Sequence, residues 1–170
     1  MSVFASLVVG GDGSTSKGGN SREVSSGIDR TTFLERRRKA DFLLIGGETA
    51  RCEPYHRTPV PVVISSRSMI NSLADNRLAH WWNLSPAAAL AKGIEKFGGN
   101  VLVESGPTFL EQLILSKALD GIYLSITEVV GGENPINVAD LLENFSEVTR
   151  SEIEGTIFIE ARTLKSVQHL

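Results

Sequence analysis

Three short segments of the sequence combine the residue types that bind phosphate groups in proteins. Each follows an apolar run rich in β-branched residues, which is typical of a buried strand. Two segments, one at Gly46 and Gly47 and one at Ser105 and Gly106, are turns that open a helix and would leave backbone N–H groups free for an anion. The third, Ser65-Ser66-Arg67-Ser68, offers hydroxyls and a guanidinium, which can hold a phosphate monoester together. One such turn alone is equally well explained as an ordinary strand-to-helix connection with a polar tip, but three of them favour a dinucleotide cleft.

A basic segment is the next candidate for anion binding. Residues 35–39 (Glu-Arg-Arg-Arg-Lys) end a helix that we expect from about Ile28 to Lys39. Cations are favoured at the end of a helix by its dipole, so a solvated helix end is the simpler explanation for most of them. Because consecutive residues point around a helix, at most one or two of these cations could face inward and bind an anionic group.

The composition argues against several kinds of chemistry. Cys52 is the only cysteine, which excludes an intrachain disulfide and a zinc cluster of thiolates, and the three histidines are scattered. We therefore expect no metal. The net charge of −3 gives no basic field that would attract nucleic acid. The apolar N-terminus lacks a basic leader and is too short to span a membrane, so we expect a cytoplasmic protein without a membrane partner.

Strands and helices alternate along the chain. We expect core strands over residues 3–9, 41–45, 60–64, 101–103 and 121–127, an edge strand near 78–82, and helices over 28–39, 86–97, 107–115 and 138–144, with a short helix after residue 46. Residues 148–153 and 156–161 flank Glu154 and Gly155 as an antiparallel hairpin. This order predicts a three-layer α/β/α domain with a mainly parallel central sheet and an antiparallel C-terminal hairpin. The length of 170 residues fits a single domain.

Two glycine-rich segments are expected to lack regular structure. Residues 10–21 form an unusually long loop for a compact domain, and such loops are usually functional or mobile. We consider a flap over a ligand and a disordered surface loop as the two explanations. Residues 131–135 are the second expected loop. Residues 10–21 lack the GxxxxGK[ST] spacing of a phosphate-binding P-loop.

Taken together, these motifs resemble the pyrimidine reductase domain of riboflavin biosynthesis (the RibD C-terminal type), which shares the dihydrofolate reductase fold. The resemblance covers almost the whole chain. It is carried by Asp12-Gly13 with Gly19 and Ser21, by Asp29-Arg30 with Phe33, Arg37 and Ala40-Asp41, by Gly46 to Glu53 as the family's Gly-x-x-Thr-x-Arg-x-Glu segment, by residues 62–68 and by residues 101–108. The last segment resembles the signature Val-Glu-Gly-Gly-Pro-Thr and is the most specific of the five.

The resemblance implies a function for the whole of residues 1–170 as one reductase domain. It implies that NADPH reduces the ribose of 5-amino-6-(5-phosphoribosylamino)uracil, or of a close relative, to a ribityl chain, and that the protein is a homodimer. By position, it assigns the cofactor to Gly46, Thr49, Glu53, Ser65, Ser66, Arg67, Gly106, Pro107, Thr108 and Phe109. It assigns the substrate to Asp12, Ser21, Arg37 and Glu104, with Arg37 on the phosphate. It identifies no catalytic acid.

The chain departs from the family pattern at two positions. Gly10 stands where many relatives carry serine, and Ser105 replaces the first glycine of a pair whose peptide bond is often cis in this fold. The His-x-Glu and Pro-Cys-x-x-Cys motifs of the deaminase that is often fused to this reductase are missing, so we expect a reductase alone. Two alternatives stay open: a reductase of the same fold acting on another substrate such as a pterin, and a non-catalytic nucleotide-binding protein. For dihydrofolate reductase itself, Asp29 is the only candidate carboxylate on the first helix.

Overall fold

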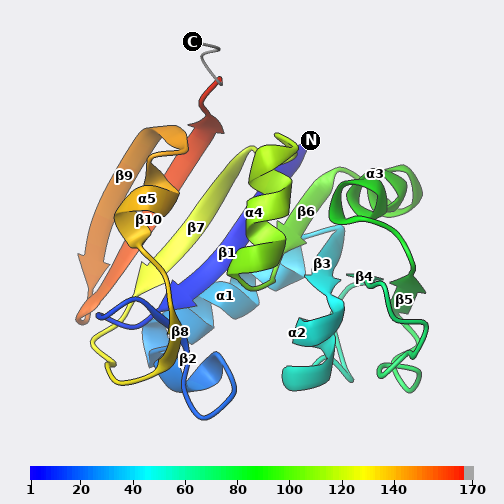
Figure 1. Ribbon diagram of the computed structural model, residues 1–170, viewed down its shortest axis with the longest axis horizontal. Coiled ribbons are helices and arrows are strands. Elements are labelled where there is room, and N and C mark those ends of the chain that lie inside the picture. Colours follow the sequence, from blue (N-terminus) through cyan, green and yellow to red (C-terminus); the bar gives the residue numbers. More distant parts are fainter. Residues whose placement is uncertain (167–170) are drawn as a thin grey trace.

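An eight-stranded sheet forms the centre of the computed structural model, which describes residues 1–166 (Figure 1). Its strands are β1 (Ser2–Val9), β3 (Phe42–Gly46), β4 (Val62–Ser65), β5 (Ala79–Trp82), β6 (Asn100–Val103), β7 (Gly121–Ile126), β9 (Phe145–Ile153) and β10 (Thr156–Leu164). Their spatial order is β5-β4-β3-β6-β1-β7-β10-β9. All neighbours are parallel except β10, which runs antiparallel to β7 and to β9. The predicted parallel sheet with an antiparallel C-terminal hairpin is therefore confirmed.

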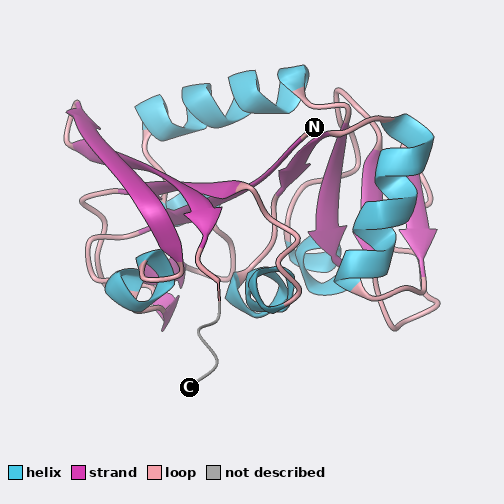
Figure 2. Ribbon diagram, turned by 90° about the horizontal axis from the view of Figure 1, so that it is seen from above, coloured by secondary structure: helices cyan, strands magenta, loops and turns pink. Residues whose placement is uncertain are grey.

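Helices cover both faces of the sheet, which gives the predicted three layers. Helix α1 (Gly27–Lys39) lies on one face, and α4 (Pro107–Leu115) and α5 (Val138–Leu142) lie on the other (Figure 2). Helix α3 (Pro86–Phe97) packs beside α4 over β3 and β4. The central strands β3 and β4 are buried along their whole length, as expected for strands covered on both sides.

Helix α3 approaches the sheet closely because of one glycine. A Cβ atom at Gly93 would lie 2.5 Å from the ring of Phe42 on β3, so a side chain has no room there. The helix begins as predicted at Ser85 and Pro86, with the Ser85 hydroxyl accepting a hydrogen bond from the N–H of Ala88 at 3.3 Å. This packing completes the apolar core between α3, α4 and the sheet.

Helix α1 faces the sheet with polar side chains instead of an apolar stripe. Arg37 is buried, and the guanidinium of Arg36 lies 3.9 Å from the centre of the Tyr123 ring on β7. Tyr123 in turn stacks on Phe4 of β1, with 4.7 Å between the ring centres. Arg38 and Lys39 are exposed. The prediction that at most one or two cations of this helix face inward is thus confirmed.

The two predicted loops contain more regular structure than expected. Strand β2 (Ser14–Ser16) pairs antiparallel with β8 (Glu133–Pro135) in a second, two-stranded sheet. The Glu133 carboxylate also accepts hydrogen bonds from the N–H groups of Gly18 and Gly19 at 3.0 and 3.4 Å. The prediction of irregular loops was wrong here, because the pairing joins segments that lie more than 110 residues apart.

The remaining elements follow the predicted order with small shifts in their bounds. Helix α2 (Gly47–Cys52) follows β3 directly, and a short 3-10 helix, η1 (Arg22–Val24), precedes α1. The C-terminal hairpin extends beyond the predicted strands, because Phe145 pairs with Leu164. Within residues 1–166, no helix is long and apolar enough to cross a membrane.

Candidate functional site

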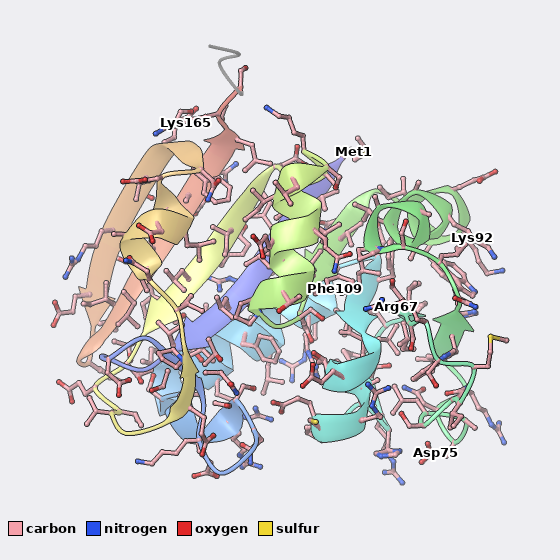
Figure 3. The ribbon with its side chains drawn as sticks, viewed as in Figure 1. Met1, Arg67, Asp75, Lys92, Phe109 and Lys165 are labelled. Atoms are coloured by element: carbon pink, nitrogen blue, oxygen red, sulfur yellow. The ribbon has the colours of Figure 1, made fainter. Side chains whose placement is uncertain are left out.

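A cavity of about 1270 Å³ lies at the carboxyl edge of the parallel strands. The segments that follow β3, β4 and β6 all contribute to its wall, together with one face of α1 from Asp29 to Arg37 and the segment from Thr15 to Ser21. Figure 3 shows Phe109 at the first turn of α4 and Arg67 after β4 on this side of the molecule. The three phosphate-binding turns predicted from the sequence therefore border one cavity.

Thirteen of the fourteen residues assigned by resemblance line this cavity. Asp12 is the exception, because its carboxylate is used within the loop that carries it. One oxygen of Asp12 accepts from the N–H and the hydroxyl of Ser14 at 3.1 and 2.6 Å, and the other accepts from the N–H of Gly131 at 2.8 Å. The hydrogen bond from the Ser14 hydroxyl, followed by that from Gly131, lowers the pKa of Asp12 from 3.8 to about 2. In this structure Asp12 joins two loops and does not face the cavity.

The turns after β3 and β6 are joined by a serine hydroxyl. Ser105 Oγ accepts a hydrogen bond from the N–H of Gly46 at 2.7 Å and lies 3.4 Å from the hydroxyl of Thr49. A Cβ at Gly46 would lie 3.0 Å from the ring of Phe109, so the ring packs directly on the backbone of the other turn. The Ser105–Gly106 peptide bond is trans. The two turns are thus joined by a hydrogen bond and by direct packing.

The N-terminus of α4 offers donors to a ligand. Gly106 is the N-cap and no side chain caps the helix, while Pro107 occupies the first helical position and has no N–H. A Cβ at Gly106 would meet no heavy atom within 4 Å, so the space beside this backbone is open. The N–H groups of Thr108 and Phe109 belong to the first turn, where helices bind anions.

The turn after β4 contains both structural and available groups. The Ser65 hydroxyl donates to the carbonyl of Leu84 at 2.7 Å and so holds the segment that leads into α3. Ser66 Oγ accepts from the N–H of Ser68 at 3.1 Å and keeps its own proton for another partner. Arg67 is exposed and has no ion-pair partner within residues 1–166. Ser66 and Arg67 are therefore the groups of this turn that can bind a phosphate.

Arg51 is a cavity residue to which the sequence reasoning gave no role. Its side chain extends back over the start of α2, where a Cβ at Gly47 would lie 3.1 Å from Arg51 Nη1. The same Cβ would lie 2.5 Å from Ser66 Oγ. Arg51 and Ser66 thus flank the same glycine. The sequence did contain a signal for Arg51, which is the arginine of the Gly-x-x-Thr-x-Arg-x-Glu segment and lies one helical turn after Gly47, on the same face.

Arg37, Glu104 and Tyr55 form a buried cluster in the cavity wall. Arg37 Nη2 donates to Glu104 Oε2 at 2.7 Å, and Arg37 Nε lies 2.9 and 3.1 Å from the two carboxylate oxygens. The Tyr55 hydroxyl donates to Glu104 Oε2 at 2.6 Å. The structure brings together Arg37 and Glu104, which the resemblance assigned separately to the substrate. Sequence reasoning missed Tyr55, because it lies in a loop without a motif.

Burial and the charge of Glu104 together shift the pKa values of Arg37 and Tyr55. Burial would lower the pKa of Arg37, but the hydrogen bonds and the charge of Glu104 outweigh it and raise that pKa above its ordinary value. Burial, and then the charge of Glu104, raise the pKa of Tyr55 well above 10. Arg37 is therefore a cation and Tyr55 a neutral hydroxyl donor throughout the physiological range.

The opposite part of the cavity is bordered by α1 and the first loop. Asp29 is buried and accepts a hydrogen bond from the Ser25 hydroxyl at 2.6 Å. Glu53 accepts from the N–H of Ser21 at 2.7 Å, which ties the first loop to the end of α2. Within the described part of the chain, no three His, Cys, Asp or Glu side chains are grouped so that they could hold a metal ion.

Comparison with models of protein families gives a match over most of the chain. A family model described as the RibD C-terminal domain matches residues 1–154. A search of curated proteins finds no match.

Several solved structures resemble the chain. A diaminohydroxyphosphoribosylaminopyrimidine deaminase/5-amino-6-(5-phosphoribosylamino)uracil reductase from Thermotoga maritima has a TM-score of 0.71 and 14% identity and covers 95% of this chain. The chain spans 56% of that longer protein. A pyrimidine reductase-like protein from Corynebacterium diphtheriae has a TM-score of 0.70 and 15% identity over 97% of this chain and 92% of its own. A dihydrofolate reductase from Enterococcus faecalis, complexed with NADP(H), has a TM-score of 0.67 and 16% identity, and the match covers 95% of this chain and 96% of the reductase. At these identities the likeness shows the fold, and it confirms the predicted dihydrofolate reductase-like architecture.

Proposed function

Because the chain belongs to the RibD C-terminal domain family, we propose that it is a pyrimidine reductase of riboflavin biosynthesis. In this proposal NADPH reduces the ribose of 5-amino-6-(5-phosphoribosylamino)uracil, or of a close relative, to a ribityl chain. The observation that carries the proposal is the meeting of three phosphate-binding turns and the Arg37–Glu104 pair at one cavity. The structural neighbours are consistent with it, since one is named as a reductase of this uracil and another is complexed with NADP(H).

The size of the cavity supports two ligands side by side. Its volume of about 1270 Å³ exceeds the range of about 300–1,000 Å³ that is usual for one small ligand. A dinucleotide and a phosphorylated nucleoside analogue together need a cleft of this kind. The cavity wall also changes in character, from glycine turns and hydroxyls near β4 to paired charges near α1.

The residues of the three turns fit a dinucleotide. The open N-terminus of α4 and the turn at Gly46 offer backbone donors to the central phosphates. Ser66 and Arg67 offer a hydroxyl and a guanidinium to the phosphate that distinguishes NADPH from NADH. When bound, NADPH supplies the hydride, and the protein supplies orientation and electrostatics.

The substrate would lie between α1 and the end of β6. Ser21 and Glu104 border this part of the cavity, and Glu53 holds the N–H of Ser21 in place at 2.7 Å. A carboxylate such as Glu104 can accept hydrogen bonds from ribose hydroxyls and so orient the carbon that receives the hydride. On the same resemblance we propose a cytoplasmic homodimer, which sedimentation and fractionation would test.

The proposed function is tested by titrating NADPH and then adding the phosphoribosylamino-pyrimidine. We expect saturable NADPH binding and substrate-dependent oxidation of the cofactor, with the ribitylamino compound as product. Binding without oxidation would instead favour another substrate or a non-catalytic nucleotide-binding protein. Absence of binding to both NADPH and NADH would overturn every enzyme proposal made for this chain.

A reductase acting on a pterin is the second candidate. It is favoured by Asp29, because a buried carboxylate in the cavity wall on the first helix could bind the amino and N–H groups of a heterocycle. The same assay separates the two candidates when a dihydropterin replaces the phosphoribosylamino-pyrimidine. Oxidation of NADPH by the dihydropterin alone would favour this candidate.

A further inference from the structure

The hydrogen bonds of the Arg37–Glu104–Tyr55 cluster are unevenly divided between the two carboxylate oxygens. Glu104 Oε2 receives Arg37 Nη2 at 2.7 Å, Tyr55 Oη at 2.6 Å and a longer contact from Arg37 Nε at 3.1 Å. Glu104 Oε1 receives only Arg37 Nε, at 2.9 Å. Since each carboxylate oxygen has two acceptor positions, Oε2 is fully used and Oε1 has one left.

The charges of the cluster cancel. Arg37 and Glu104 form a two-pronged ion pair with their side chains 11% and 3% exposed, so the positive charge of Arg37 is already compensated. A phosphate on this arginine would bring its negative charges next to the buried carboxylate. Arg22 and Arg30 also line the cavity and have no ion-pair partner within residues 1–166. They offer a phosphate uncompensated charge, which Arg37 does not.

Aromatic rings also hold Arg37 in its place. Its guanidinium lies 4.7 Å from the centre of the Phe33 ring and 4.9 Å from that of Tyr55. Each contact favours the guanidinium in its present position, beside Glu104. Turning Arg37 toward a phosphate would give up both contacts and leave the buried charge of Glu104 without its ion-pair partner, which is strongly unfavourable.

We propose that Arg37, Glu104 and Tyr55 form a neutral subsite that binds the hydroxyls of the substrate's sugar through Glu104 Oε1. In this subsite Tyr55 is a positioning residue, because its hydroxyl occupies Oε2 and leaves Oε1 for the ligand. Arg37 holds Glu104 and does not bind the phosphate. The inference rests on the proposed function, and it replaces the role that the family resemblance gave to Arg37.

The test compares two ligands and three variants. The ligands are the phosphoribosylamino-pyrimidine and its dephosphorylated form, and their dissociation constants are measured by calorimetry on protein saturated with NADP⁺. The variants are Tyr55→Phe, Arg37→Lys and, as a matched control, Tyr123→Phe. Tyr123 is the other tyrosine of the chain, and it lies outside the cavity, stacked on Phe4.

We expect Tyr55→Phe to weaken the binding of both ligands about tenfold, as the loss of a hydrogen bond to a charged group would do. The ratio of the two dissociation constants should stay within twofold of the wild-type ratio, as should the affinity for NADPH. Arg37→Lys should weaken the binding of both ligands by a common factor, because lysine keeps the charge and loses the two-pronged geometry. Tyr123→Phe should change the dissociation constant of neither ligand. If Tyr55 had a merely structural role, Tyr55→Phe would weaken the binding of cofactor and substrate together.

Several outcomes would overturn the inference. One is a loss in Arg37→Lys that is confined to the phosphorylated ligand, since this would place the phosphate on Arg37. Others are unchanged binding in Tyr55→Phe and failure of the wild-type protein to bind the dephosphorylated ligand. If the wild-type protein does not reduce the phosphorylated substrate, the proposed function falls and this inference falls with it. If the wild-type protein turns the substrate over normally and the variants give one of these contrary results, only the inference is overturned and the proposed function stands.

Discussion

The hydroxyl of Ser105 accepts a hydrogen bond from the backbone N–H of Gly46 at 2.7 Å and so joins the ends of β6 and β3. Ser105 stands where the family signature has a glycine, which could not provide this acceptor. The serine is buried, and its hydroxyl also approaches Thr49 at 3.4 Å. The departure from the family pattern therefore adds a contact between two of the turns for which we propose phosphate binding.

Replacing Ser105 by alanine tests this contact. The buried N–H of Gly46 would lose its partner, so we expect the free energy of unfolding to fall by about 1–3 kcal/mol. Chemical denaturation measures this change. The matched control is Ser72→Ala, because the buried Ser72 hydroxyl has no hydrogen-bond partner within the described residues and its loss should be nearly neutral. Equal effects of the two substitutions would contradict the role given to Ser105.

Gly47 is expected to be essential for the shape of the turns after β3 and β4, where we propose that the cofactor binds. In Gly47→Ala the new Cβ would lie 2.5 Å from Ser66 Oγ and 3.0 Å from Ser66 Cβ, so Ser66 must shift. We expect a loss of about 1–3 kcal/mol in stability, as for other overpacked sites, together with weaker NADPH binding in a fluorescence titration. Gly27→Ala is the control, since a Cβ there meets no atom within 4 Å. A variant at position 47 with wild-type affinity for NADPH would argue against a cofactor site at this turn.

Acid should loosen the loop that carries Asp12. The pKa of Asp12 is about 2 in the fold, below its ordinary value of 3.8, mainly because of the hydrogen bond from the Ser14 hydroxyl. A lowered pKa means that the ionised carboxylate stabilises the fold fully above pH 3.8, and that this contribution is lost as the pH falls toward 2. Asp12→Asn should therefore be less stable than the wild-type protein at pH 7, and the difference should shrink between pH 4 and pH 2. Denaturation curves across this range measure it, and a constant difference would contradict the assignment.

The alternation of apolar strands and capped helices was enough to predict the layers and the direction of the strands. It was enough because each central strand is buried on both faces and each crossover begins with a recognisable signal, such as Ser85 and Pro86 or Gly106 and Pro107. The pairing of β2 with β8 could not be predicted in the same way. It depends on Glu133 contacting two glycine N–H groups across a long stretch of chain, and glycine-rich sequence gives no sign of such a partner.

The candidate site shows the same division. The three turns could be predicted because parallel strands bring their carboxyl ends to one edge, whatever the side chains do. The partner of each side chain could not. Arg37 and Glu104 lie 67 residues apart, and their pairing follows from the helix α1 crossing the end of β6. Tyr55 lies in a loop without periodicity, so only the folded structure shows its hydroxyl on Glu104.

Arg67 offers the most direct test of the cofactor assignment. The guanidinium is exposed and has no ion-pair partner within residues 1–166, so its removal should not destabilise the fold. If Arg67 binds the phosphate that NADH lacks, Arg67→Gln should weaken the binding of NADPH and leave the binding of NADH unchanged. A charge-assisted contact of about 1.5–3 kcal/mol corresponds to a loss of about tenfold or more in the preference for NADPH. The preference is measured as the ratio of kcat/KM for the two cofactors.

Two further arginines make this test specific. Arg57→Gln serves as the control, because Arg57 is exposed and does not line the cavity. Arg51→Gln tests the arginine on α2 that lies beside Ser66: Arg51 Nη1 and Ser66 Oγ would lie 3.1 and 2.5 Å from a Cβ atom at Gly47. If the preference narrows in Arg51→Gln and not in Arg67→Gln, the phosphate is read from α2 and not from the end of β4. If neither substitution changes the ratio, NADPH is not distinguished from NADH at this end of the cavity, and the assignment of Ser66 and Arg67 to its phosphate must be abandoned.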